Sequence, residues 1–173
     1  NLTATHVEQM LGRSSGKWNN LLTPIPAMDR YYRENYAFEG RIISQGYPRD
    51  DSLVDGHHEL RRTDTRARLN IADDQRAILY APTWRGHVEE TMLYSLPTGE
   101  QIVSALLTRG ATVIFRPHPF SYDFPEDAAT IARINSLLEA DRRKTGRAHL
   151  WGAAAEKERS ILDCINDSDA MVS

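Results

Sequence analysis

The sequence of 173 residues has a single cysteine, no long apolar run and no excess of positive charge. Cys164 alone cannot form an internal disulfide or a cysteine-based zinc site, and its isolation suits a reducing compartment. No run reaches the length of about 18 apolar residues that predicts a membrane-spanning helix. The formal net charge of −3, without a basic stripe, argues against a nucleic-acid-binding domain.

Several catalytic signatures are also missing. The sequence has no G-x-G-x-x-G or Walker pattern for a phosphate loop, and no serine stands in a nucleophile-elbow context. His57, His58 and Glu59 resemble a metal cluster only superficially, because adjacent side chains diverge on a helix or strand. Nothing in the sequence demands a metal or a cofactor.

What is present is a regular alternation of short apolar runs and helical patterns after Arg76. Strands are predicted at 76–81, 111–115, 148–150 and 170–172, and helices at 99–109, 127–144 and 160–166. Thr98 with Gln101 predicts a capping box for the first of these helices, and Gly110 predicts its end. The alternation indicates right-handed βαβ units, so the predicted fold class is α/β, a Rossmann-like parallel sheet with flanking helices.

The N-terminal part predicts a smaller unit of its own. Strands are expected at 17–23 and 41–43, on either side of a helix over 27–36 whose tyrosines 31, 32 and 36 we expect in the core. The segment 59–69 is polar and arginine-rich, with few apolar residues. This composition predicts a solvent-exposed linker helix between two units. The predicted domains are therefore residues 1–50, a linker over 51–75, and residues 76–173.

Two predicted strands end at prolines that are followed by groups able to bind an anion. The run Ile78–Ala81 stops at Pro82, and Thr83, Trp84 and Arg85 follow it in a loop. In a parallel α/β sheet, ligands bind beyond the carboxyl ends of the strands. A hydroxyl, an indole and a guanidinium at that place suit a nucleotide diphosphate.

The second strand end carries Arg116 and His118, with Pro117 and Pro119 holding the backbone extended. The imidazole could contact phosphate oxygens or deliver a proton to a leaving phosphate, or it could simply pack in a loop. Arg85 and Arg116 could clamp a diphosphate; an arginine of this kind alone somewhat more often forms a surface salt bridge, and it is the pair at two strand ends that favours the clamp. Thr83 could donate to phosphate or cap a turn. Trp84 could stack on a base, but packing is commoner for such a tryptophan.

These motifs together resemble a known family. The segment 78–85, the segment Gly46-Tyr47-Pro48-Arg49-Asp50-Asp51 upstream and Arg116-Pro117-His118-Pro119 downstream are similar to the CDP-glycerol glycerophosphotransferases, which build teichoic-acid-type wall polymers. The resemblance covers about residues 17 to 173. It implies a GT-B architecture, in which two Rossmann-like domains face each other and the C-terminal one holds the activated donor.

On this resemblance, residues 1–50 would end the acceptor-side domain and residues 76–173 would begin the donor-binding domain. His118 would be catalytic, and Thr83, Arg85, Arg116 and His118 would bind the donor diphosphate. The donor would be CDP-glycerol or a related CDP-alditol, and the acceptor a lipid-linked polymer. The resemblance implies a cytoplasmic enzyme at the inner face of the cell membrane, attached peripherally through other parts of the protein, with no nucleic-acid partner and no metal.

The sequence departs from the family pattern in three places. The His-Gly motif with the favoured general base would lie before Asn1, and the phosphate-binding Asp-x-Ser-Ser motif would begin after Ser173. We therefore expect an excised, inactive fragment of an enzyme. Asp50 stands where the family often has asparagine. Two other interpretations stay open, a GT-B glycosyltransferase that uses a nucleotide sugar and a non-catalytic Rossmann-like binding domain.

Overall fold

The computed structural model describes residues 16–85, 87–88, 91–92, 96–157 and 159–173. The chain forms two compact units, one that ends at Val54 and one that begins at Asp55. This division differs from the predicted linker over 51–75. The short helix α3 (Asp51–Val54) falls in the first unit and helix α4 (His58–Arg68) in the second.

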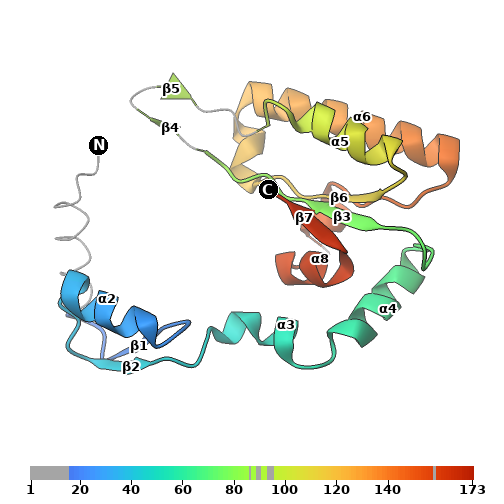
Figure 1. Ribbon diagram of the computed structural model, residues 1–173. Helices are drawn as coiled ribbons and strands as arrows, with labels where there is room; N and C mark the ends of the chain where they lie inside the picture. Colours follow the sequence, from blue (N-terminus) through green and yellow to red (C-terminus); the bar gives the residue numbers. More distant parts are fainter. Residues whose placement is uncertain (1–15, 86, 89–90, 93–95, 158) are drawn as a thin grey trace. The chain divides into compact units, whose positions relative to one another are not determined.

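From residue 16 on, the N-terminal unit contains one βαβ arrangement (Figure 1). Strand β1 (Asn20–Leu22) pairs in parallel with β2 (Arg41–Ile43), and helix α2 (Ala27–Tyr36) connects them. Thr23 directly follows β1 and is fully buried, with its hydroxyl donating to Asp29 Oδ1 over 2.9 Å. A 3₁₀ turn, η1 (Pro48–Asp50), follows and leads into α3. The three predicted elements of this unit are confirmed.

The tyrosines of α2 do not form a core, which corrects the sequence prediction. None of the ten residues of α2, all of which the structure describes, is buried, and Tyr31 is 45% exposed. The rings of Tyr31, Tyr32 and Tyr36 instead pack on one another, with centroids 5.4 to 5.8 Å apart. Residues four positions apart on a helix are neighbours, as Tyr32 and Tyr36 are, so these aromatic side chains can pack on one another without a partner element.

The C-terminal unit is built on a parallel sheet with the strand order β6-β3-β7. Strand β3 (Ala77–Tyr80) is central, and Leu79 lies between Ile114 of β6 (Thr112–Phe115) and Met171 of β7 (Ala170–Val172). The predicted strand at 148–150 is reduced to one parallel bridge between Leu150 and Ile114. The predicted α/β class with a parallel sheet is confirmed.

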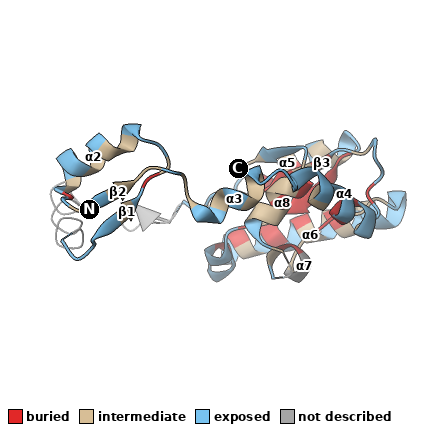
Figure 2. Cartoon of the chain, turned by 90° about the horizontal axis from the view of Figure 1, so that it is seen from below, coloured by how far each residue is buried: buried red, intermediate tan, exposed pale blue. Residues whose placement is uncertain are grey.

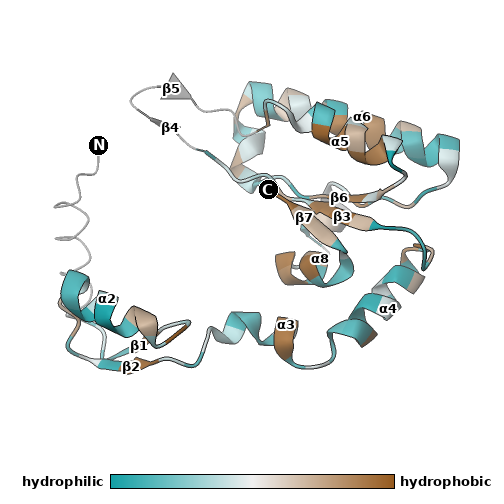
Figure 3. Ribbon diagram, viewed as in Figure 1, coloured by the Kyte–Doolittle hydropathy of each residue, from teal (hydrophilic) through white to brown (hydrophobic). Residues whose placement is uncertain are grey.

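Helices cover both faces of this sheet, as Figure 1 shows. Successive side chains of each strand point to opposite faces, so the strands contribute to two hydrophobic cores. Helices α5 (Gly99–Thr108) and α6 (Pro125–Thr145) lie on the face that receives Tyr80, Val113 and Phe115. Helix α8 (Ile161–Asp167) lies on the other, with Leu79 and Ile114. Buried residues gather in this unit in Figure 2, and the strands are among its most apolar segments in Figure 3.

Helix α4 packs against α8 and is not the solvated connection that its composition predicts. Arg66 is buried, and its Nη2 atom donates to the carbonyl oxygens of Ala72, over 2.8 Å, and Gln75, over 2.5 Å. Its Nη1 atom lies 3.5 Å from Asp169 Oδ2, which also accepts from the Ala77 amide over 2.7 Å. The arginine-rich face of α4 therefore secures the beginnings of β3 and β7.

The helix ends agree with the sequence only in part. The predicted capping box at Thr98 is wrong, because in the described residues its side chain makes no capping hydrogen bond. The predicted glycine ending is confirmed, with Gly110 at φ +77°. Strands β4 (His87–Val88) and β5 (Thr91–Met92) pair antiparallel within the segment where a loop was expected. Among the described helices, none combines the length and the apolar character that a membrane crossing needs. Two short elements, η2 (Pro119–Asp123) and α7 (Ala153–Glu156), complete the unit.

Candidate functional site

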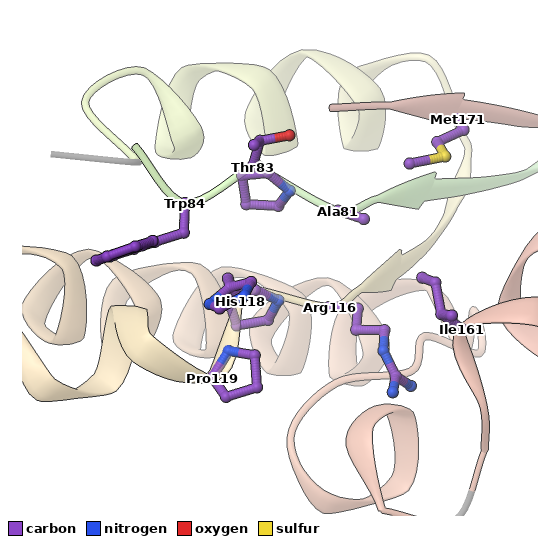
Figure 4. Close-up of a pocket in the computed structure, with 10 residues that line it drawn as sticks. Ala81, Thr83, Trp84, Arg116, His118, Pro119, Ile161 and Met171 are labelled. Carbon is purple, nitrogen blue, oxygen red and sulfur yellow. The ribbon is translucent and has the colours of Figure 1, made fainter. Parts of the chain in front are cut away.

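A cavity of about 430 Å³ opens at the carboxyl edge of the β6-β3-β7 sheet (Figure 4). The edge is held together by backbone hydrogen bonds, because the Arg116 amide donates to the Tyr80 carbonyl and the Ala81 amide to the Val172 carbonyl, each over 2.9 Å. The loops after β3 and β6 supply most of the lining, which also includes one residue from α8 and one from β7. The lining residues are Ala81, Pro82, Thr83, Trp84, Arg116, Pro117, His118, Pro119, Ile161 and Met171.

His118 stands in this lining with an exposed side chain and an extended backbone, at φ −66° and ψ 139°. It is the N-cap residue of η2, and its Nδ1 atom accepts a hydrogen bond from the Phe120 amide over 3.2 Å. An imidazole nitrogen that accepts carries no proton, so in the neutral ring the proton is on Nε2. The ring is thus set up to donate from Nε2.

Trp84 packs against the imidazole. The two ring centroids are 5.9 Å apart with an angle of 22° between the planes, an offset-stacked arrangement. The indole also contacts Phe120 edge to face at 5.2 Å, and Phe124 in a stacked geometry at 6.3 Å. Of the two interpretations of Trp84, packing is the one that the structure shows, and its partner is the candidate functional histidine.

Arg116 lines the cavity but directs its guanidinium away from Trp84 and His118 (Figure 4). Its Nη1 atom donates to the carbonyl oxygens of Ala155 and, over 2.7 Å, Arg159, and its Nη2 atom lies 3.4 Å from the Glu156 carbonyl oxygen. These acceptors belong to the end of α7 and the segment that leads into α8. In this arrangement the guanidinium ties that segment to the end of β6, and a diphosphate contact from Arg116 stays a prediction.

Thr83 and Arg85 lie at a neighbouring cavity of about 320 Å³ on the α5 side of the same edge. Pro82 and Thr83 line both cavities, whereas Arg85 lines the second with Thr98 and Ser173 and His118 lines the first. Arg85 and Thr83 are exposed. The structure therefore gathers the four predicted residues at one sheet edge, but it distributes them over two adjoining cavities.

Two ionisable groups near Arg116, the Cys164 thiol and the Tyr122 hydroxyl, are held in their neutral forms. Burial raises the pKa of the Cys164 thiol more than the neighbouring Arg116 guanidinium lowers it, which keeps this sulfur from acting as a nucleophile. Burial and a hydrogen bond to Glu156 raise the pKa of Tyr122, whose hydroxyl donates to that carboxylate. Within the described residues, no group of three or more histidine, cysteine, aspartate or glutamate side chains is placed to hold a metal ion.

Sequence reasoning missed the groups that hold the histidine. The Phe120 amide and the rings of Phe120 and Phe124 were not singled out, although Pro119 directly after His118 is typical of a tight turn that brings a backbone amide back to the side chain. The stacking of Trp84 had no signal in the sequence, because the two rings come from different loops.

Comparison with known proteins gives one family model. Residues 1–144 match the model described as CDP-Glycerol:Poly(glycerophosphate) glycerophosphotransferase. Over 147 residues, covering 75% of this chain and 20% of the relative, the chain is 34% identical to a teichoic acid poly(glycerol phosphate) polymerase of Bacillus subtilis (strain 168). It is 35% identical over 80 residues, covering 42% of the chain and 19% of the relative, to a teichoic acid glycerol-phosphate transferase of Staphylococcus aureus (strain NCTC 8325 / PS 47).

The fold is similar to that of a solved structure of the wall teichoic acid polymerase TagF. The TM-score is 0.59 at 20% sequence identity, and the match covers 98% of this chain and 38% of that one. This likeness agrees with the predicted GT-B-type fold class. The chain spans about a fifth of the length of the two curated relatives described above.

Proposed function

The chain belongs to the CDP-glycerol:poly(glycerophosphate) glycerophosphotransferase family, and on that basis we propose that it is the donor-binding part of a wall-polymer transferase. The intact protein moves glycerol phosphate from CDP-glycerol to a hydroxyl of a lipid-linked polymer and releases CMP. The observation that carries the proposal is the cavity at the carboxyl edge of the sheet, with His118 in its lining. That edge is where ligands bind in parallel α/β sheets.

In the proposed reaction the acceptor oxygen attacks the phosphorus next to the glycerol. The bond between that phosphorus and the bridging oxygen breaks, and the oxygen leaves with CMP. Such transfers depend on positioning and on neutralising charge at the leaving and transferring groups. His118 donates from Nε2 to a diphosphate oxygen, a role that its hydrogen bond from the Phe120 amide supports.

The other predicted residues have different roles in this proposal. Thr83 lines both cavities and can donate its hydroxyl to phosphate oxygens in either. Arg85 supplies positive charge from the second cavity, toward the donor or the growing polymer phosphate. Arg116 acts by holding the segment before α8, where Ile161 lines the first cavity.

The two units have different tasks on this account. The unit that begins at Asp55 is the start of the donor side, and the unit that ends at Val54 belongs to the acceptor side. Since the donor is a water-soluble nucleotide and the acceptor a lipid-linked polymer, the reaction takes place at the cytoplasmic face of the membrane. Other parts of the protein make the membrane contact.

A donor screen on the intact protein tests the proposal. CDP-glycerol, CDP-ribitol and a set of UDP-sugars are offered with a lipid-linked acceptor, and CMP or UDP release is measured together with incorporation into polymer. Release of CMP with CDP-glycerol and incorporation of glycerol phosphate support the proposal. Turnover with a UDP-sugar alone would favour the glycosyltransferase alternative, and binding without turnover would favour the non-catalytic one.

A further inference from the structure

Contacts from Phe120 and Trp84 hold the imidazole of His118. The Phe120 amide donates to Nδ1 over 3.2 Å and fixes which nitrogen carries the proton. The indole of Trp84 lies against the ring at 5.9 Å, with only 22° between the planes, and limits how the ring can turn. His118 itself is exposed, so without these contacts its ring would be free to rotate.

Trp84 is in turn fixed by rings from beyond the second strand end. Phe120 of η2 meets it edge to face at 5.2 Å, with 70° between the planes, and Phe124 stacks on it at 6.3 Å. The Phe120 ring also lies 5.1 Å from the imidazole, so the rings of Trp84, His118 and Phe120 all contact one another. The indole thereby connects the loop after β3, which holds Thr83, with the loop after β6, which holds His118.

We propose that Trp84 is a positioning residue, which together with the Phe120 amide holds His118 so that Nε2–H is presented at the cavity. This inference rests on the proposed function, because it assigns a task to Trp84 in the donor binding described above. A hydrogen bond to a phosphate oxygen depends on direction, so a ring that can flip or tilt spends less time in the productive orientation. Trp84 acts only through His118.

A double-mutant cycle on the intact protein tests the proposal, with kcat and KM measured for CDP-glycerol turnover. We expect Trp84→Ala to reduce kcat/KM about tenfold, at the upper end of the effect of an aromatic pair. Trp84→Phe keeps a ring against the imidazole and should retain most of the activity. In a His118→Ala background, Trp84→Ala should cause no further loss, because the residue that it positions is gone.

The controls separate positioning from folding. Trp18→Ala removes an indole that is 48% exposed in the N-terminal unit and should leave turnover unchanged. If Trp84→Ala does not fold, the cycle is run with Trp84→Phe and Trp84→Leu, which differ in whether a ring remains. Side-chain ¹⁵N shifts of His118 give a second readout, with a protonated Nε2 expected in the wild type and a mixture of tautomers in Trp84→Ala.

Two outcomes would overturn the inference, and they show whether the proposed role of His118 fails as well. If His118→Ala reduces activity but Trp84→Ala costs the same factor in both backgrounds, Trp84 acts independently and only this inference fails. If His118→Ala leaves turnover unchanged, the role of His118 in the proposed function fails, and the positioning role of Trp84 fails with it.

Discussion

The Phe120 amide nitrogen lies 3.2 Å from Nδ1 of His118 and leaves Nε2 as the nitrogen that donates. A glutamine amide can place an N–H near the position of Nε2, whereas an asparagine amide reaches only that of Nδ1. We expect His118→Ala and His118→Asn to reduce the turnover of the intact protein by at least a factor of about 10². His118→Gln should recover about tenfold of that loss.

Initial rates of CMP release from CDP-glycerol measure this difference. An asparagine variant more active than the glutamine variant would show that Nδ1 is the functional nitrogen. A glutamine variant as inactive as alanine would point to proton delivery by the imidazole, because an amide cannot transfer a proton in that way.

Arg116 should matter for stability, since its guanidinium holds backbone carbonyls of Ala155, Glu156 and Arg159. Arg116→Ala leaves these half-buried acceptors without their charged donor, so we expect the free energy of unfolding to fall by about 2–4 kcal/mol. Urea denaturation of the intact protein, followed by tryptophan fluorescence, measures the change. The matched control is Arg109, an exposed arginine of the same unit whose guanidinium donates to the Ala105 carbonyl at the surface, and its replacement by alanine should change stability by about 0.5 kcal/mol or less. Equal stability of both variants would argue against this role of Arg116.

Arg85 should affect the binding of the donor rather than the stability of the fold. Its cavity adjoins that of His118 through Pro82 and Thr83, so its charge lies on the same sheet edge. We expect Arg85→Ala to raise the KM for CDP-glycerol about tenfold, the effect of losing a hydrogen bond to a charged group. Arg85→Lys keeps the charge and should show a smaller increase. An unchanged KM in both variants would remove Arg85 from the donor site.

His149 should make the stability of the C-terminal unit depend on pH. Its buried ring accepts from the Val113 amide at Nδ1 over 3.0 Å, and Nε2 lies 2.9 Å from Asp141 Oδ2, a carboxylate that also pairs with Arg147. Burial lowers the pKa of His149 more than Asp141 raises it, with Arg147 and Arg142 lowering it further. Protonation would also break the hydrogen bond to β6.

The sign follows from the lowered pKa. The unfolded chain binds this proton more readily than the folded one. The free energy of unfolding is therefore unaffected by His149 titration above the ordinary histidine pKa of about 6.5, and it falls as the pH drops below that value. The loss can reach at most about 1.4 kcal/mol per pH unit for one proton. Urea unfolding at pH 5, 6 and 7 measures this slope, and His149→Asn, which can still accept from Val113, should flatten it. A wild-type slope that His149→Asn leaves unchanged would assign the effect to other groups.

The strands of the C-terminal unit could be predicted because their signals are local. The apolar runs before Pro82 and Pro117 are short and bounded, and the parallel topology follows from the helices between them. The meeting of Thr83, Arg85, Arg116 and His118 at one edge follows from the same topology.

The contacts of these side chains could not be predicted, because their partners lie far along the chain. The carbonyls that hold Arg116 come about 40 residues later, and Trp84 meets a histidine on another loop. The polar composition of α4 suggested a solvated helix, yet Arg66 is buried because backbone carbonyls and Asp169 satisfy its guanidinium. The tyrosines of α2 show the opposite case. They are aromatic and were expected in the core, yet they pack on one another at the surface.

Equilibrium binding of CDP-glycerol to the intact protein tests most directly whether the donor diphosphate lies against His118. Calorimetric titrations compare the wild type, His118→Ala and His58→Ala, the last changing an exposed histidine of α4. We predict that His118→Ala weakens binding about tenfold or more, while His58→Ala binds like the wild type. Equal affinity of all three proteins for CDP-glycerol would contradict the account.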